Sequence, residues 1–141
     1  MQKIIIASDH GGFNLKTLIF DHLKKSGYDV EDYGCYNNES CDYPLYAQKV
    51  AKEVSENKDL LGILVCGTGI GMSIAANRYK NVRASHCTDT YSAKMTRLHN
   101  DSNILCLGER ITGSGLATDI VDIWLNTPFE GGRHKKRIDM I

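Results

Sequence analysis

Three short runs of this sequence carry no polar side chain, and they limit the folds that the chain can adopt. The runs are residues 4–7, 61–66 and 104–107. A strand that is apolar along its whole length must be covered on both faces, which is typical of a parallel sheet between layers of helices. Segments with apolar residues at helical spacing separate the runs. We therefore predict an α/β domain with the sheet in its middle.

The whole chain follows this alternation. Strands are expected at about residues 4–7, 28–33, 61–66, 82–87 and 104–107, and helices at about 13–26, 43–56, 72–78, 90–99 and 114–125. The prediction is a three-layer α/β/α sandwich with a five-stranded, Rossmann-like parallel sheet. Because no repeat or linker interrupts the pattern, residues 1–141 are expected to form one domain, with a C-terminal tail over residues 127–141.

Composition excludes several classes of protein. Seventeen Lys and Arg balance seventeen Asp and Glu, whereas a nucleic-acid-binding domain is usually strongly basic. No apolar run approaches the roughly 18 residues of a membrane span, and the apolar run at residues 4–7 comes too early for a signal peptide. The five cysteines form no C-x-x-C pair, so neither a zinc knuckle nor a disulfide scaffold is indicated. We expect a cytoplasmic protein.

Functional groups of such a fold should lie where the parallel strands end. The best candidate is the loop Cys66-Gly67-Thr68-Gly69-Ile70-Gly71, which joins a strand to a helix. Its glycines allow several backbone N–H groups to point at one anion, and the helix N-terminus stabilises a thiolate at Cys66. The spacing is not the dinucleotide G-x-G-x-x-G, and Met72 stands where a tyrosine-phosphatase loop has its arginine. A tight strand–helix connection is the alternative.

Three other places carry polar residues that could act on a ligand. Asp9 and His10 follow the first strand, where a helix cap would explain only Asp9. His99 and Asn100 end a helix, and helix capping explains them equally well. Arg133 and Arg137 are four apart, so on a helix they would share a face suited to one phosphate, although a solvated basic tail is the usual meaning of such a run.

Six motifs in this order resemble the ribose/galactose isomerase family, and most closely its type B ribose-5-phosphate isomerases. The matching segments are residues 8–13 (SDHGGF), 42–44 (DYP), 66–71 (CGTGIG), 97–101 (RLHND), 108–110 (GER) and 130–137 (EGGRHKKR). They cover nearly the whole chain. The tail segment favours the ribose branch over the galactose-6-phosphate branch.

The resemblance implies an aldose–ketose isomerase that interconverts ribose 5-phosphate and ribulose 5-phosphate through a cis-enediolate, in the pentose phosphate pathway. It assigns Cys66 as the base, Thr68 as a hydrogen-bonding partner of the substrate oxygens, and His99 with Asp9 to ring opening. No Asp or Glu occurs in residues 70–73 to replace Cys66, although some members of the family use a carboxylate there.

Binding residues also follow from the resemblance. The backbone amides of Gly67, Gly69, Ile70 and Gly71 would form the anion hole. The phosphate would be held by His10, Arg110, Arg133 and Arg137, and the sugar would be contacted by Tyr43 and Asn100. No metal or organic cofactor is expected. The partners implied are a small sugar phosphate and a second copy of the chain, in a homodimer or dimer of dimers with shared active sites.

Two alternatives stay open at this point. An isomerase of a six-carbon phosphate, such as allose 6-phosphate or galactose 6-phosphate, would use the same proton transfer. A non-catalytic phosphosugar sensor would need the arginines but neither Cys66 nor His99.

Overall fold

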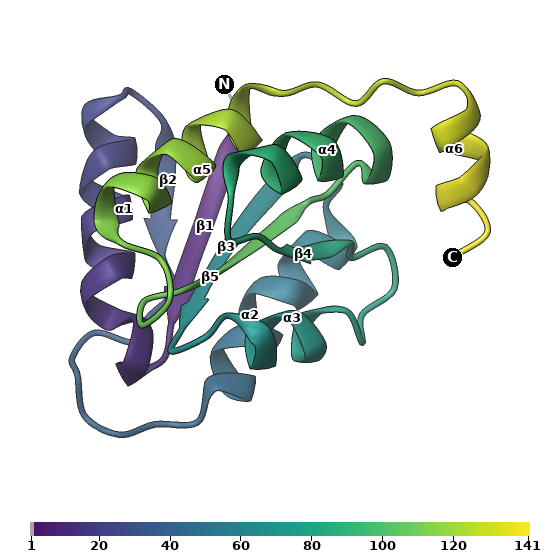
Figure 1. The fold of residues 1–141 in the computed structure, drawn as a ribbon. Helices are drawn as coiled ribbons and strands as arrows, with labels where there is room; N and C mark the ends of the chain where they lie inside the picture. Colours follow the sequence, from purple (N-terminus) through teal and green to yellow (C-terminus); the bar gives the residue numbers. More distant parts are fainter. Residues whose placement is uncertain (1) are drawn as a thin grey trace.

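Five parallel strands pair through the centre of the computed structural model, which describes residues 2–141 (Figure 1). They are β1 (Lys3–Ser8), β2 (Asp29–Asp32), β3 (Leu60–Cys66), β4 (Ala84–His86) and β5 (Ile104–Gly108). Their order across the sheet is β2-β1-β3-β5-β4. The apolar runs are the three central strands, so the prediction of a parallel sheet that is covered on both faces is confirmed.

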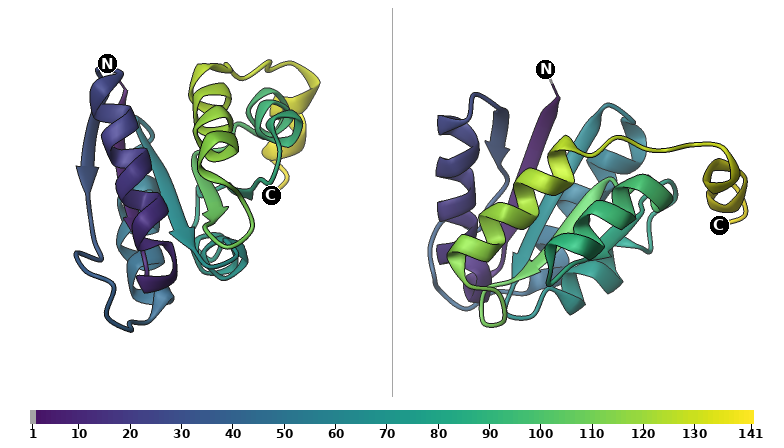
Figure 2. Two further views of the ribbon diagram at one scale, coloured as in Figure 1. Left: turned by 60° about the vertical axis from the view of Figure 1, so that its left-hand side comes forward. Right: turned by 45° about the horizontal axis from the view of Figure 1, so that its top comes forward.

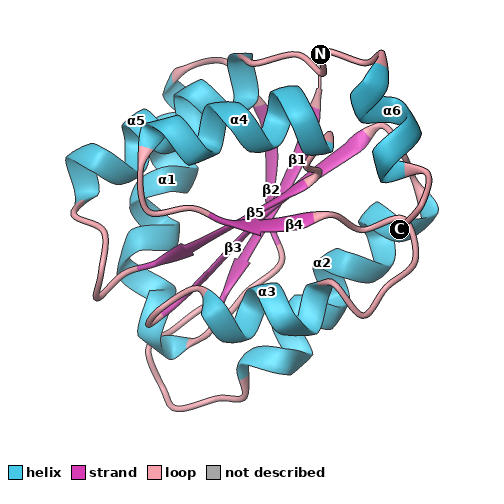
Figure 3. Cartoon of the chain, turned by 45° about the vertical axis from the view of Figure 1, so that its right-hand side comes forward, coloured by secondary structure: helices cyan, strands magenta, loops and turns pink. Residues whose placement is uncertain are grey.

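Helices cover both faces of the sheet and make the three layers visible in Figure 3. The α-helices of the chain are α1 (Phe13–Lys25), α2 (Tyr43–Glu56), α3 (Ile70–Ala76), α4 (Thr90–Asn100), α5 (Ser114–Asn126) and α6 (Arg133–Ile138), and the first five of them cover the sheet. Helices α1, α4 and α5 pack on one face against Ile4 and Ile6, whereas α2 and α3 pack on the other against Ile5 and Ala7. Successive residues of a strand point to opposite faces, which is why an unbroken apolar run fills both cores.

The strand order creates a switch point between β1 and β3. The chain leaves β1 for β2 on one side and then returns past β1 to form β3 on the other. In open α/β sheets, ligands bind outside the carboxyl ends of the strands where the connections diverge in this way. The segments at this crevice are the short 3₁₀ turn His10–Gly12, which follows β1, and the glycine loop after β3.

Two elements differ from the sequence-based prediction. Helix α3 begins at Ile70 rather than Met72, because Gly69 has a left-handed backbone (φ 82°) that lets the helix start immediately after it. Strand β4 covers only Ala84–His86 of the expected 82–87. The Val82 N–H is already bonded to the carbonyl of Tyr79 in a turn, so it is not available to the sheet.

The tail forms a short helix apart from the sheet. Helix α6 packs against α4, and it lies on the opposite side of the molecule from α1 (Figure 2). Arg133 and Arg137 therefore do share a helix, one turn apart. Within residues 2–141, no helix combines the length and the apolar character needed to cross a membrane.

A buried lysine fastens the loop between β2 and α2. The ammonium of Lys16 on α1 bonds both carboxylate oxygens of Asp32, at 2.8 and 3.0 Å, and the carbonyl of Cys35 at 2.5 Å. The Lys16 side chain is only 1% exposed. A buried charge must be paired in this way, and here the pair ties α1 to the loop that leads to Cys41.

Candidate active site

Cys66 is the last residue of β3, at the switch point. Cys66 pairs with Gly108 at the end of β5 and is 5% exposed. Its Sγ accepts a hydrogen bond from the N–H of Gly69 at 3.0 Å. The sulfur is therefore held firmly, beside the N-terminus of α3.

Packing requires a glycine at position 69 of this loop and at position 108 of the neighbouring strand. A Cβ on Gly69 would lie 2.8 Å from the His86 ring and from the Leu107 carbonyl carbon, and one on Gly108 would lie 2.5 Å from the Thr68 carbonyl. Real Cβ atoms do not approach that closely, so any side chain would push the loop away from β5. The Thr68 hydroxyl accepts the Ile70 N–H at 3.2 Å, and the residue is exposed. The loop conformation is thus determined by contacts with the strand next to it.

Backbone hydrogen bonds join the loops after β1 and β5 to the glycine loop. The N–H of Arg110 donates to the carbonyl of Gly67 at 3.0 Å, and its guanidinium lies 3.4 Å from where a Cβ on Gly67 would stand. The Asp9 carboxylate accepts the N–H of Gly12 at 3.1 Å. The N–H of Asp9 donates to the carbonyl of Val65 at 3.3 Å. Asp9, Cys66 and Arg110 therefore belong to one rigid edge.

His10 and Tyr43 complete this group. His10 Nδ1 accepts the backbone N–H of Cys41 at 3.1 Å, which leaves Nε2 as the nitrogen that can donate to a ligand. The Tyr43 ring, at the start of α2, lies 2.8 Å from where a Cβ on Gly71 would stand. We call Asp9, His10, Tyr43, the loop 66–71 and Arg110 the carboxyl-edge group.

The other predicted residues lie together elsewhere. His99 and Asn100 end α4, and with Arg133 and Arg137 of α6 they line a pocket of about 340 Å³. The remaining lining residues are His134, Ile138 and Ile141. We call His99, Asn100, Arg133 and Arg137 the tail group.

The two groups lie at opposite ends of the strands. Strand β5 starts at Ile104, shortly after the end of α4 with its part of the tail group, and ends at Gly108 beside Cys66. Four strand residues advance by about 13 Å, so the predicted partners His99 and Asp9 cannot meet within one chain. Figure 1 shows α6 away from the arrowheads of β1 and β3. The predicted phosphate ligands are likewise divided, with His10 and Arg110 in one group and both tail arginines in the other.

The cysteines differ in their environments. Burial raises the pKa of the Cys106 thiol far above its usual range and also raises the pKa of Cys87. Burial is likewise the main cause of the raised pKa of Cys41. These three stay protonated near neutral pH, whereas Cys66 receives a backbone N–H. Cys66 is the cysteine that ends a strand at the switch point and receives a backbone N–H, so it is the candidate nucleophilic or basic thiol.

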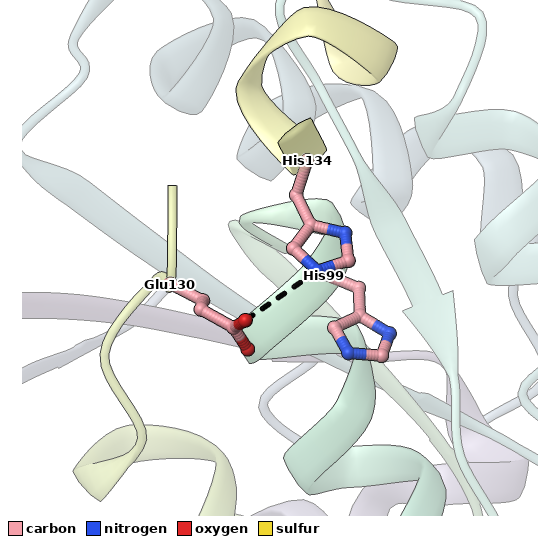
Figure 4. Close-up of side chains that lie close together, drawn as sticks. All are labelled: His99, Glu130 and His134. Atoms are coloured by element: carbon pink, nitrogen blue, oxygen red, sulfur yellow. Dashed lines mark ion pairs between the residues drawn. The ribbon is translucent and has the colours of Figure 1, made fainter. Parts of the chain in front are cut away.

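The sequence analysis missed two side chains beside the tail group. The His134 ring stacks on His99, and Glu130 Oε1 lies 3.8 Å from Nε2 of His134 (Figure 4). The donor atoms of these three residues lie within 4.8 Å of one another, so the set could in principle hold a metal ion. The sequence contains one signal for the contact, because Glu130 and His134 are four residues apart.

Comparisons with known proteins identify the family. A family model described as ribose/galactose isomerase matches residues 4–141. The chain is 48% identical to ribose-5-phosphate isomerase B of Escherichia coli strain K12, over 100% of this chain and 95% of that protein.

Solved structures are equally similar. Ribose-5-phosphate isomerase B of Clostridium thermocellum superposes with a TM-score of 0.95 at 55% identity, covering 98% of this chain and 93% of that one. The Mycoplasma genitalium enzyme, solved with bound ribulose 5-phosphate, gives a TM-score of 0.94 at 44% identity, covering 98% and 92%.

Proposed function

This chain belongs to the ribose/galactose isomerase family, and we propose that it interconverts ribose 5-phosphate and ribulose 5-phosphate. The observation that carries the proposal is the thiol at the switch point: Cys66 ends a buried strand, receives the Gly69 N–H, and adjoins a loop of backbone donors. An aldose–ketose isomerase needs a base and an anion hole in this arrangement. Relatives named ribose-5-phosphate isomerase B and the neighbour solved with ribulose 5-phosphate support the same substrate.

The chemistry moves one proton between adjacent carbons. In the open-chain aldose phosphate, the Cys66 thiolate takes the proton from C2, and the electron pair forms the C1–C2 double bond of a cis-enediolate. The carbonyl electrons of C1 move onto its oxygen as that double bond forms. The same thiol then returns its proton to C1, while the proton of the C2 hydroxyl passes to the C1 oxygen, so that C2 becomes the ketone and C1 carries the hydroxyl. The sum is an isomerisation without net oxidation, so it needs no oxidant or reductant, and a base together with an anion hole can perform it without a metal or organic cofactor.

Negative charge on the oxygens needs donors that are already in place. The amides of Gly67 and Gly71 are candidates, together with the exposed hydroxyl of Thr68. The amides of Gly69 and Ile70 already donate to Cys66 Sγ and Thr68 Oγ1, so in this scheme they turn to the substrate only when those bonds open. Because backbone contacts with β5 fix this loop, its free donors need little reorganisation when the enediolate forms, which is the basis of such stabilisation.

Ring opening and phosphate binding require both groups of residues. We assign ring opening to His99 with Asp9, and phosphate binding to His10, Arg110, Arg133 and Arg137. Asn100 and Tyr43 contact the sugar in this scheme. Since these residues are divided between opposite ends of the strands, one chain does not form the complete site.

We therefore propose a homodimer, or a dimer of dimers, in which the carboxyl-edge group of one chain meets the tail group of another. The tail, residues 127–141, then serves the partner's site rather than its own. The proposal places the enzyme in the cytoplasm, which its five free cysteines favour, and in the pentose phosphate pathway.

A coupled assay on ribose 5-phosphate tests the function. We expect turnover in the presence of EDTA, and slower turnover of allose 6-phosphate at equal concentration. No turnover of ribose 5-phosphate would refute the proposal. A clear preference for the hexose phosphate would move the chain to the six-carbon alternative.

A further inference from the structure

Glu130 is tied to the end of α4 by its backbone. Its N–H donates to the carbonyl of Leu98 at 3.1 Å, one residue before His99. Its side chain is exposed, and one carboxylate oxygen faces His134 (Figure 4). A change in the Glu130 side chain therefore leaves the backbone contact between the tail and α4 in place.

The His134 ring connects Glu130 with His99. The two imidazole rings are stacked, with centroids 4.2 Å apart and planes inclined by 12°. His134 Nε2 is buried without a hydrogen-bond partner, and its nearest acidic oxygen is Glu130 Oε1 at 3.8 Å. A buried polar nitrogen is costly unless a partner is close, so the carboxylate stabilises the ring in this position.

The stack opposes a shared metal ion. A ring nitrogen donates in the plane of its own imidazole. Two nearly parallel planes, one above the other at 4.2 Å, do not converge on one ion. For His99 and His134 to chelate zinc together, one ring would have to rotate and break the stack. The observed arrangement is therefore better suited to orienting His99 than to binding a metal.

Charges around His134 agree with a supporting role for Glu130. The groups that face the ring are His99 on α4, Arg133 and Arg137 on α6, and Glu130 before α6. Burial and the three basic neighbours lower the pKa of His134, and only the Glu130 carboxylate raises it. Removing that carboxylate leaves the ring among cations alone, so its contact with His99 loses electrostatic support.

We propose that Glu130 is a positioning residue, which holds the His134 ring in place and through the stack fixes the orientation of His99 for ring opening. The inference rests on the proposed function, because it takes His99 as the group that acts on the furanose. Glu130 itself touches neither the substrate nor the reacting atoms.

The test compares Glu130→Gln with Asp139→Asn, in EDTA-treated protein. Asp139 is a suitable control because it lies next to α6 and pairs with Lys135 on the exposed side. Glu130→Gln should lower kcat on ribose 5-phosphate about tenfold, less than the 10²–10⁴-fold contribution of an acid–base group itself. KM and the inhibition constant of inorganic phosphate should change less than about twofold, because both guanidiniums remain. Asp139→Asn should leave all three unchanged.

An NMR titration of the imidazoles needs no substrate and separates this inference from the proposed function. Loss of the carboxylate should move the His134 titration to lower pH and shift the His99 resonances. His99→Asn and His134→Asn variants assign the signals. Unchanged histidine titrations, or a kcat within twofold of wild type, would overturn the inference. So would a rise in the phosphate inhibition constant that matches the loss of kcat, because that result means a displaced tail. Wild-type protein without activity on ribose 5-phosphate would instead refute the proposed function.

Discussion

The carboxyl-edge group and the tail group are built in different ways. Around Cys66, the loops after β1, β3 and β5 are linked by backbone hydrogen bonds, and Gly12, Gly69 and Gly108 leave no space there for a side chain. The tail group is divided between the end of α4 and α6, a helix of six residues that packs against α4 and presents exposed arginines. A base must be placed accurately relative to a carbon–hydrogen bond, whereas long guanidinium side chains tolerate small shifts of the helix that carries them. In the proposed scheme, proton transfer at carbon therefore lies on the rigid edge, whereas the two tail arginines add adjustable contacts to the phosphate.

The largest effect is expected at the rigid edge. Cys66→Ala removes the base and should lower kcat by about 10²–10⁴-fold, with phosphate affinity nearly unchanged. Cys66→Ser should be almost as poor, because a hydroxyl rarely ionises. Cys106→Ala is the matched control and should retain activity. Iodoacetamide should inactivate the wild type, and substrate should protect it. If Cys66→Ala kept more than about a tenth of the wild-type kcat, the loss would be smaller than a general base contributes. Another residue would then have to be the base.

Mixing subunits tests whether the two groups come from different chains. Cys66→Ala and His99→Ala are each expected to be inactive as pure oligomers. Random dimers of the two should recover about a quarter of wild-type activity, because half of the dimers are mixed and each has one intact site of two.

Cys66→Ala mixed with Arg110→Ala provides the control for that experiment. Both changes lie in the carboxyl-edge group, so no mixed dimer contains an intact site and activity should not recover. Recovery in both mixtures, or in neither, would mean that the sites are not shared in this way. Shared sites would also be excluded if light scattering showed a monomer and that monomer had full activity.

The arginines of α6 should affect binding rather than chemistry. Arg137→Ala removes one of two guanidiniums from the pocket and should raise KM about 10–100-fold, the value of a charge-assisted hydrogen bond to phosphate, while kcat changes little. Inorganic phosphate should also inhibit this variant more weakly. Lys136→Ala, on the same helix but outside the pocket lining, should behave as wild type. An unchanged KM for Arg137→Ala would remove this residue from the phosphate site.

The smallest effect concerns stability. A Cβ on Gly12 would lie 2.5 Å from the Val65 backbone, so Gly12→Ala should lower the free energy of unfolding by about 1–3 kcal/mol. On α5, Gly115 has nothing within 4 Å of the same position. Gly115→Ala should therefore stabilise the protein by about 0.5–1 kcal/mol. Urea denaturation measures both. If the two variants had equal free energies of unfolding, the backbone around Gly12 would adapt to a side chain more easily than its packing indicates.

The carboxyl-edge group was easier to predict than the tail group for a physical reason. Cys66 and Asp9 follow apolar strands directly, and parallel strands bring such ends to one edge, so local pattern and fold class place them together. The separation of His99 from Asp9 could not be predicted, because it depends on the strand order and on where the tail docks. The hydrogen bond from Glu130 to Leu98 joins segments 32 positions apart in the chain, and no local pattern indicates it. The pairing of Lys16 with Asp32 was missed for the same reason.

Burial of that pair also sets how the protein responds to salt. Mobile ions weaken attraction between charges that water surrounds, and they act much less on charges inside the protein. The surface pair Lys3–Glu31, whose side chains are 44% and 54% exposed, should fade as ionic strength rises. The Lys16–Asp32 pair, whose side chains are 1% and 26% exposed, should weaken less, and with it the path of the chain from β2 toward Cys41 is kept. The Cys41 N–H donates to His10. Anions of an added salt should therefore compete with the substrate phosphate for the exposed arginines, while the loop beside His10 keeps its shape.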